Sequence, residues 1–235
     1  MAVETGKVDR ITGISSMAMR RILAELGETY EQQTGQPIDI VAVGGVDAAR
    51  RVRDGEVFDF VVLAADAIEQ LVSGSRVDPR SRTDLARSPV AMAVGAGAKQ
   101  PDVSTEAAVR AAVLNARSIG YSTGPSGAHL TRLFESWGIA DAIAPRIVQA
   151  PPGTPVATLV ARGDVELGFQ QLSELMHLPG IAVIGLLPPE IQVATMFSAA
   201  VCTASNYPAA AKAFLDFAAS PYADATKRGH GMDPT

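Results

Sequence analysis

The sequence lacks the patterns that build disulfide frameworks, metal centres or membrane spans. Its 235 residues include one cysteine, Cys202, so a disulfide within the chain and a metal site built from cysteines are both excluded. The three histidines, His129, His177 and His230, are far apart and form neither an HxxxH nor an HExxH pattern, so we expect no metal. No run of 18 apolar residues occurs, and we therefore expect no insertion into a membrane.

Positive charge is also scarce. Twenty Lys and Arg residues oppose 25 Asp and Glu residues, which gives a formal net charge of −5, and no basic block or aromatic–basic interleaving occurs. This balance disfavours nucleic acid as a partner. Local hydrogen-bond donors would therefore have to hold an anionic ligand in spite of the negative net charge of the protein.

The motifs of nucleotide binding and of covalent hydrolysis are missing as well. The glycines between Gly120 and Gly127 do not form GxGxxG, and no GK[ST] occurs, so we expect no nucleotide and no other cofactor. The same stretch lacks the GxSxG elbow of serine hydrolases. His129 follows Ser126 by three residues without an evident acid partner. It is either a capping or surface histidine or a proton carrier.

The N-terminal stretch MAVETGKVDR lacks the charged start and apolar run of a signal peptide. We expect a cytoplasmic protein if Met1 is the native start, and a periplasmic one if a leader has been removed. The composition, 47% hydrophobic and 19% charged, indicates an ordered globular chain. The length suffices for one large domain or for two small lobes, with a sizeable core.

What the sequence does have is a regular alternation of apolar runs and helical patterns, which predicts an α/β fold. The predicted strands are residues 8–14, 38–43, 58–63, 90–94, 118–121, 166–169, 181–184 and 195–202. The predicted helices are residues 17–33, 48–53, 67–72, 105–114, 128–137, 156–162 and 209–219.

Small polar residues follow four of these strands, just before a helix. Ligands bind at the carboxyl ends of strands in an open α/β sheet, where helix N-termini offer free N–H groups. Glycine lets the backbone approach a ligand, and hydroxyls donate hydrogen bonds to it. We therefore predict a site for a small anion. Its candidate residues are Ser15, Ser16, Gly44, Gly45, Ala65, Ser122, Thr123, Ser126 and Gly127, with the amides Gln170 and Gln171.

Each of these loops also has an ordinary structural interpretation. Ser16 is a natural N-cap for the helix over 17–33, and Gly44-Gly45 is compatible with a simple turn. The two glutamines are compatible with surface amides. The segment from Ser122 to Gly127 contains three hydroxyl residues, which is more than a turn needs.

In order and spacing, several stretches resemble the molybdate-binding-protein-like branch of the type II periplasmic binding proteins, over nearly the whole chain. They include GISSMAMRRILAELGETYEQQTGQPIDI, GEVFDFVVLAADAIEQLV, LARSPVAMAVGAGAKQPD, SIGYSTGPSGAHLTRLFESWGI and VARGDVELGFQQLSEL. The resemblance implies two α/β lobes joined by two crossing strands, near 88–94 and 195–202, with the ligand in a cleft between them. One lobe would comprise residues 1–90 and 195–235, and the other residues 91–194.

The resemblance also implies a function. It suggests a monomeric solute-binding protein that captures a small anion, with an ABC transporter permease as partner if the chain is exported. The serine of the family's first loop matches Ser15 or Ser16. The second loop, often serine-rich in molybdate binders, reads Gly44-Gly45-Val46 here. With the extra hydroxyls from Ser122 to Ser126, this favours a di- or tricarboxylate over molybdate.

The same branch is similar to bacterial aconitate isomerase. An alternative function is therefore an isomerase that moves an allylic proton of an unsaturated polycarboxylate. The candidate proton carriers are His129, Glu174 and Ser126. A cytoplasmic ligand sensor is a third interpretation.

Overall fold

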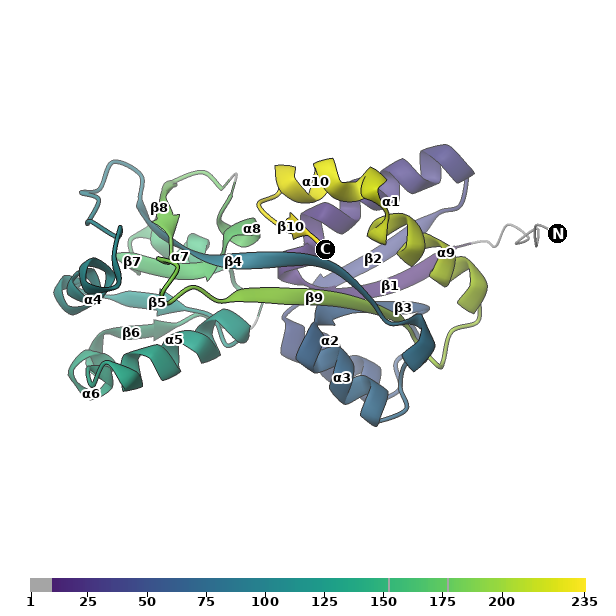
Figure 1. The fold of residues 1–235 in the computed structure, drawn as a ribbon, viewed down its shortest axis with the longest axis horizontal. Coiled ribbons are helices and arrows are strands. Elements are labelled where there is room, and N and C mark those ends of the chain that lie inside the picture. Colours follow the sequence, from purple (N-terminus) through teal and green to yellow (C-terminus); the bar gives the residue numbers. More distant parts are fainter. Residues whose placement is uncertain (1–9, 152, 177) are drawn as a thin grey trace. The chain divides into compact units, whose positions relative to one another are not determined.

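The computed structural model describes residues 10–151, 153–176 and 178–235 (Figure 1). The chain divides into two compact units, Met1–Arg87 with Met196–Thr235 (unit 1) and Ser88–Thr195 (unit 2). It leaves unit 1 within strand β4 (Thr83–Gly95) and returns within strand β9 (Ala194–Val201). Each unit carries helices on a mainly parallel sheet, which confirms the predicted α/β class.

The sheet of unit 1 has the order β2-β1-β3-β9. Strands β1 (Ile11–Ser16), β2 (Ile38–Val43) and β3 (Phe60–Ala64) are parallel, and β9 runs antiparallel to β3. The short strand β10 (Asp233–Pro234) pairs with β4 at Ala86 and Arg87. The helices of this unit are α1 (Arg20–Thr34), α2 (Gly45–Arg53), α3 (Ala65–Ser73), α9 (Pro208–Ala219) and α10 (Asp224–Gly229).

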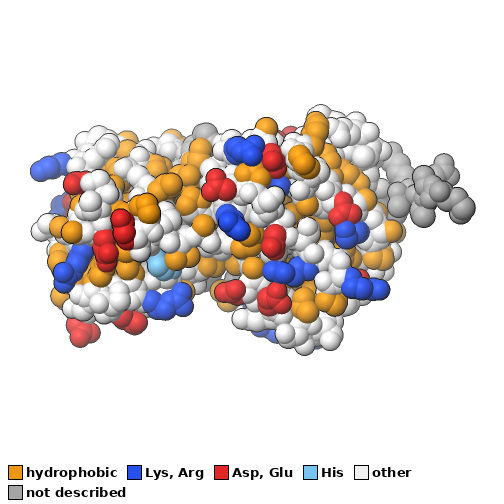
Figure 2. Space-filling model, in the orientation of Figure 1, with side chains coloured by type: hydrophobic (Ala, Val, Ile, Leu, Met, Phe, Trp, Pro, Cys, Tyr) orange, Lys and Arg blue, Asp and Glu red, His pale blue; other side chains and the backbone are white. Residues whose placement is uncertain are grey.

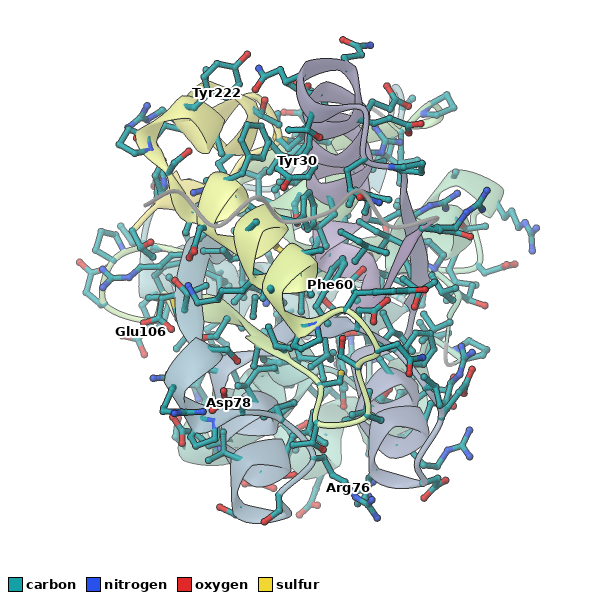
Figure 3. The ribbon with its side chains drawn as sticks, turned by 90° about the vertical axis from the view of Figure 1, so that its right-hand side faces the viewer. Tyr30, Phe60, Arg76, Asp78, Glu106 and Tyr222 are labelled. Carbon is teal, nitrogen blue, oxygen red and sulfur yellow. The ribbon has the colours of Figure 1, made fainter. Side chains whose placement is uncertain are left out.

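Two apolar clusters hold unit 1 together. In one of them, α1 and α9 pack against strand residues such as Phe60, and in the other, α2 and α3 pack against β1 and β3. The ring of Phe214 in α9 lies 5.2 Å from that of Phe60 and 5.4 Å from that of Tyr30, and Figure 3 shows Tyr30 and Phe60 beside α1 and α9. A Cβ atom on Gly13 would lie 2.2 Å from the Phe60 ring, so this strand position requires glycine.

The sheet of unit 2 is built from three parallel strands in the order β7-β5-β6, with two antiparallel strands beside them. The parallel strands are β5 (Ile119–Tyr121), β6 (Ile147–Gln149) and β7 (Leu167–Gln171). Strand β4 pairs antiparallel with both β7 and β8 (Ile181–Leu186). The helices are α4 (Glu106–Asn115), α5 (Pro125–Ser136), α6 (Ala140–Ile143), α7 (Val156–Arg162) and α8 (Leu172–Leu175).

Two neighbouring glycines let α7 approach this sheet closely. Gly120 and Gly168 are register partners on β5 and β7. A Cβ atom on Gly120 would lie 2.7 Å from Val165, and one on Gly168 would lie 2.6 Å from Val160 of α7. Gly120, at the start of the hydroxyl-rich GYSTGPSG stretch, is therefore a packing residue.

Several element boundaries differ from the sequence prediction. Strand β1 runs through Ser16, and α1 begins at Arg20 after a short 3₁₀ turn. Ser16 makes no side-chain capping bond, so its predicted role as a helix N-cap is wrong. Helix α5 begins three residues early, at Pro125, because proline suits the first helical position. Elements β6, α6, α8 and α10 were not predicted, since three to six residues are too few to show a period.

Candidate ligand-binding site

The predicted loops of unit 1 meet at one edge of its sheet, because parallel strands end on the same side. Ser16 is the register partner of Val43, the last residue of β2, and Ser15 is the partner of Val62 in β3. A Cβ atom on Gly45 would lie 3.6 Å from the Cβ of Ser16. The structure thus brings the candidates from β1 and the start of α2 together.

Among the residues that the structure describes, two serine hydroxyls at this edge find no hydrogen-bond partner. Ser15 is fully buried and Ser16 is 7% exposed, and neither Oγ atom makes a hydrogen bond. An unpaired buried hydroxyl costs about 1–3 kcal/mol. The cost is removed when a ligand oxygen accepts from the hydroxyl. Consecutive strand residues point to opposite faces of a sheet, so the two hydroxyls do not converge, and Ser16, beside Gly45 of α2, is the one suited to an anion at this edge.

Backbone donors accompany these hydroxyls. Helix α2 begins at Gly45 and α3 at Ala65, and the preceding N-cap residues Gly44 and Ala64 make no side-chain capping bond. The first-turn N–H groups and the positive end of each helix dipole therefore remain available for an acceptor. Asp47, in the first turn of α2, is paired with Arg50, which offsets its charge.

The hydroxyl-rich segment of unit 2 forms a tight turn between β5 and α5. Ser122 Oγ accepts a hydrogen bond from Gly124 N (3.3 Å), and a Cβ atom on Gly127 would lie only 1.7 Å from the Ser122 carbonyl oxygen. Ser126 is buried in the first turn of α5, whose N-cap Gly124 makes no side-chain bond, whereas Thr123 is exposed. The turn therefore presents an uncapped helix N-terminus at the carboxyl edge of the sheet.

The two glutamines belong to strand β7 and are buried, each only 2% exposed, so they are not surface amides. Gln170 Oε1 accepts from Val156 N (2.9 Å) and so caps α7, and its Nε2 donates to Glu174 Oε1 (2.8 Å). Gln171 Nε2 donates to Thr195 Oγ1 (2.7 Å). Within the described part of the chain, the amide oxygen of Gln171 makes no hydrogen bond, and neither does the buried hydroxyl of Ser173.

Glu174 is the acidic residue of this edge. It is partly buried, and burial raises the pKa of its carboxyl from the ordinary 4.5 to about 7, which the hydrogen bond from Gln170 only partly offsets. Among the residues the structure describes, it forms no ion pair with a cation. Near neutral pH both protonation states of Glu174 are populated.

His129 lies one turn into α5, where its Nε2 is 2.9 Å from the carbonyl oxygen of Ile191. The ring donates to that backbone acceptor and ties α5 to the segment before β9. Its proposed role as a proton carrier stays a prediction, with one ring nitrogen already engaged. His177 lies outside the described residues.

A cavity of about 460 Å³ lies elsewhere, at the opposite edge of unit 1, where β9 ends and β3 begins. Val77, Asp78, Cys202 and Ser205 are among its lining residues, and Figure 3 labels Asp78. Burial raises the pKa of the Cys202 thiol to about 12, which leaves it an unreactive thiol. This cavity is separate from the strand-end loops.

Neither charged side chains nor possible metal ligands gather at one place in the described part of the protein. On the face shown in Figure 2, Lys and Arg side chains are interspersed with Asp and Glu side chains. Within the ranges the structure describes, no group of three His, Cys, Asp or Glu residues is placed to hold a metal, and no helix is long and apolar enough to cross a bilayer. The strand-end loops remain the candidate site.

Three known proteins are similar to this chain over nearly its whole length. Aconitate isomerase from a Pseudomonas species is 36% identical over 232 residues, which cover 97% of this chain and 88% of the relative. The periplasmic molybdate-binding protein of Azotobacter vinelandii superposes with a TM-score of 0.81 at 19% identity, over 96% of this chain and 99% of its own. The sulfate-binding protein SubI of Mycobacterium tuberculosis H37Rv gives 0.76 at 17% identity, over 96% and 87%.

The low identity to the two solved structures means that they establish the fold, which is the type II binding-protein fold expected from the sequence. Family membership rests on the sequence itself. The family described as bacterial extracellular solute-binding protein matches residues 11–233, which span both units. With this match and the 36% identical relative, the chain belongs to the bacterial extracellular solute-binding protein family.

Proposed function

We propose that the protein binds a small anion, a polycarboxylate or an oxyanion, at the strand-end loops. The observation that carries this proposal is the buried, unpaired hydroxyl of Ser16 beside the uncapped N-terminus of α2. Such donors are complete only when an acceptor reaches them. They hold an anion without a lysine or arginine.

The similar proteins support this assignment. Two solved structures of the same fold are named for oxyanions, molybdate and sulfate, and the 36% identical relative is named for aconitate, a tricarboxylate. All of these ligands present several negatively charged acceptor oxygens. Unit 2 adds a second uncapped helix and the hydroxyls of Ser122 and Ser126, which favours the larger polycarboxylate.

Calorimetric titration of the purified protein with molybdate, sulfate, citrate and the two aconitate isomers tests the proposal. Ser16→Ala is expected to lower the affinity by about 1–3 kcal/mol, or roughly 5–150-fold, because a buried donor to a charged group is lost. Ser81→Ala is the matched control. Its hydroxyl is also buried but already bonds Asp78 O and Val201 N, so the affinity stays unchanged. Saturable binding of none of these anions would refute the proposal.

The ligand cleft between the two lobes, which the family resemblance implies, stays a prediction. The same titrations test whether both lobes bind one ligand. Such a cleft requires one ligand per chain, with an affinity that falls both in Ser16→Ala and in Ser126→Ala. Two ligands per chain, each sensitive to only one substitution, would contradict it.

A second candidate function is isomerisation of an unsaturated polycarboxylate. The specific observation in its favour is Glu174, a carboxyl with a pKa near 7, in a chain 36% identical to an aconitate isomerase. Interconversion of cis- and trans-aconitate, followed by proton NMR, tests it. Saturable binding of both isomers without interconversion would exclude this activity for aconitate.

Membership of an extracellular solute-binding family also supports a proposal about partner and location. We propose that the protein works outside the cytoplasmic membrane as the receptor of an ABC transporter permease. Cell fractionation of a strain that expresses the native gene tests the location. Recovery of the protein with the cytoplasmic fraction alone would favour the sensor or the isomerase.

A further inference from the structure

A continuous set of hydrogen bonds in unit 2 ends on a carboxyl group. Gln170 joins the N-terminus of α7 to Glu174, through its Oε1 to Val156 N (2.9 Å) and through its Nε2 to Glu174 Oε1 (2.8 Å). Because the backbone N–H of Val156 needs an acceptor, the amide has one orientation that satisfies both bonds. The amide therefore fixes one carboxyl oxygen of Glu174 and leaves the other oxygen for a further partner.

The surroundings of Glu174 do not explain why a charged side chain would be needed there for folding. Helix α8, which carries it, packs through Leu172 and Leu175 into an apolar cluster with Ala91, Ala93 and Ala157. Within the described part of the chain no cation pairs with it. An unpaired carboxyl in such a place costs stability, and costly titratable groups concentrate at functional sites.

Its position in the sheet matches that of the ligand loops of unit 2. Glu174 lies three residues beyond the end of β7, and the hydroxyl-rich turn follows β5, its parallel neighbour. The carboxyl ends of the two strands lie at the same edge of the sheet. Glu174 thus belongs to the edge where ligands bind in α/β sheets.

We propose that Glu174 carries the proton in an aconitate-isomerase-like reaction of this protein, with Gln170 as its positioning residue. The inference rests on the second candidate function above and names the group that performs it. The full reaction needs no cofactor or co-reactant.

The step balances as a proton shift. The carboxylate of Glu174 removes a proton from the methylene carbon next to a terminal carboxylate of the substrate, and the C–H electron pair becomes a C=C bond to the central carbon. The electrons of the former C=C bond move to its far carbon, which takes the proton back from the carboxylic acid of Glu174. One C–H bond breaks and another forms, so nothing is oxidised or reduced.

The other candidates fit this task less well. His129 has one ring nitrogen engaged by the carbonyl of Ile191. Among the described residues no hydrogen bond joins Ser126 to a base, and an unactivated serine hydroxyl does not take up protons near neutral pH. The raised pKa of Glu174, about 7, suits a group that must both accept and return a proton.

The experiment compares the wild-type protein with Glu174→Gln, which keeps the size of the side chain. Interconversion of cis- and trans-aconitate is followed by proton NMR, and binding of each isomer is measured by calorimetry. We expect turnover to fall by about 10²–10⁴-fold, the usual share of a general acid–base group, while the affinity changes less than about threefold. Glu174→Asp should recover part of the rate.

Two further variants separate chemistry from structure. Glu166→Gln alters an acidic residue just before the start of β7, at the opposite edge, and should keep turnover within about twofold. Gln170→Leu should lower kcat, leave KM nearly unchanged and shift the midpoint of the pH–rate profile, because the carboxyl loses its hydrogen bond. A purely structural role of Gln170 would not move that midpoint.

The outcomes distinguish this inference from the binding proposal. Turnover retained in Glu174→Gln, or a wild-type protein that binds both isomers without interconverting them, overturns the inference and leaves anion binding intact. A wild-type protein that binds neither aconitate isomer overturns it too. If that protein also binds none of the other anions, anion binding falls with it.

Discussion

Unit 1 and unit 2 end their parallel strands in the same way but place different chemistry there. The edge of unit 1 offers donors, namely the unpaired hydroxyl of Ser16 and the uncapped starts of α2 and α3. The edge of unit 2 has an uncapped helix as well, and adds a titratable carboxyl held by Gln170. A repeated strand–loop–helix arrangement thus places fixed donors at one edge and a titratable carboxyl at the other.

This difference bears on whether the chain only binds its ligand or also reacts with it. Fixed neutral donors stabilise an anion whatever the pH, whereas a carboxyl with a pKa near 7 changes its charge under physiological conditions. Fold alone does not determine which of the two a member of the family does.

The largest expected effect is a loss of stability when a glycine in a strand-end loop is replaced, and it compares how tightly the two loops are packed. In Gly127→Ala the new Cβ would lie 1.7 Å from the Ser122 carbonyl oxygen, so the turn must open. We expect a loss of about 3 kcal/mol or more in the free energy of unfolding, measured by urea denaturation. Gly45→Ala is the matched substitution in unit 1, where the nearest atom is at 3.6 Å, and stability should stay within about 0.5 kcal/mol. Equal losses would mean that the two loops do not differ in rigidity.

The GYSTGPSG stretch illustrates what the sequence could and could not predict. Its place between a strand and a helix is local, so it followed from the apolar run and the proline. The separate tasks of its glycines depend on distant or non-local contacts. Gly120 makes room for Val165, and Gly127 makes room for the Ser122 carbonyl. Composition does not distinguish these tasks.

The candidate site shows the same division. Sequence reasoning grouped Ser15, Ser16, Gly44 and Gly45, because parallel strands end at one edge whenever the fold is α/β. It treated Ser16 as a helix cap and Gln170 as a residue beyond its strand, since both strands turned out longer than their apolar cores suggested. The bond between Gln170 and Val156 spans 14 residues and depends on how α7 packs, so no local pattern could reveal it.

A second prediction uses pH to separate the two edges. The folded pKa of Glu174 lies above its unfolded value of 4.5, so between these values the folded protein binds more protons. The stabilising contribution of this group is thus fully present below about pH 4.5, and that contribution is lost as the pH rises through about 7. The loss amounts to about 1–3 kcal/mol.

In Glu174→Gln this pH-dependent loss disappears. Urea denaturation at pH 5 and pH 8 should therefore show the variant gaining stability relative to wild type at the higher pH. Ser16→Ala, in unit 1, should leave the difference between the two pH values as in wild type. A variant–wild-type difference that does not change with pH would mean that Glu174 titrates as an ordinary surface acid.

The smallest expected effect tests the hydroxyls of unit 1 without any ligand. Ser15→Ala removes a fully buried hydroxyl that has no partner, so the unliganded protein should gain about 0.5–1 kcal/mol in stability. Ser198→Ala is a control in the same unit, because its buried hydroxyl donates to Asp84 Oδ1 (2.6 Å), and stability should fall by about 1 kcal/mol. Thermal denaturation in an anion-free buffer measures both. If both serines serve folding, each replacement should lower the stability of the protein. If a serine is kept for a ligand, its replacement should raise the stability of the unliganded protein.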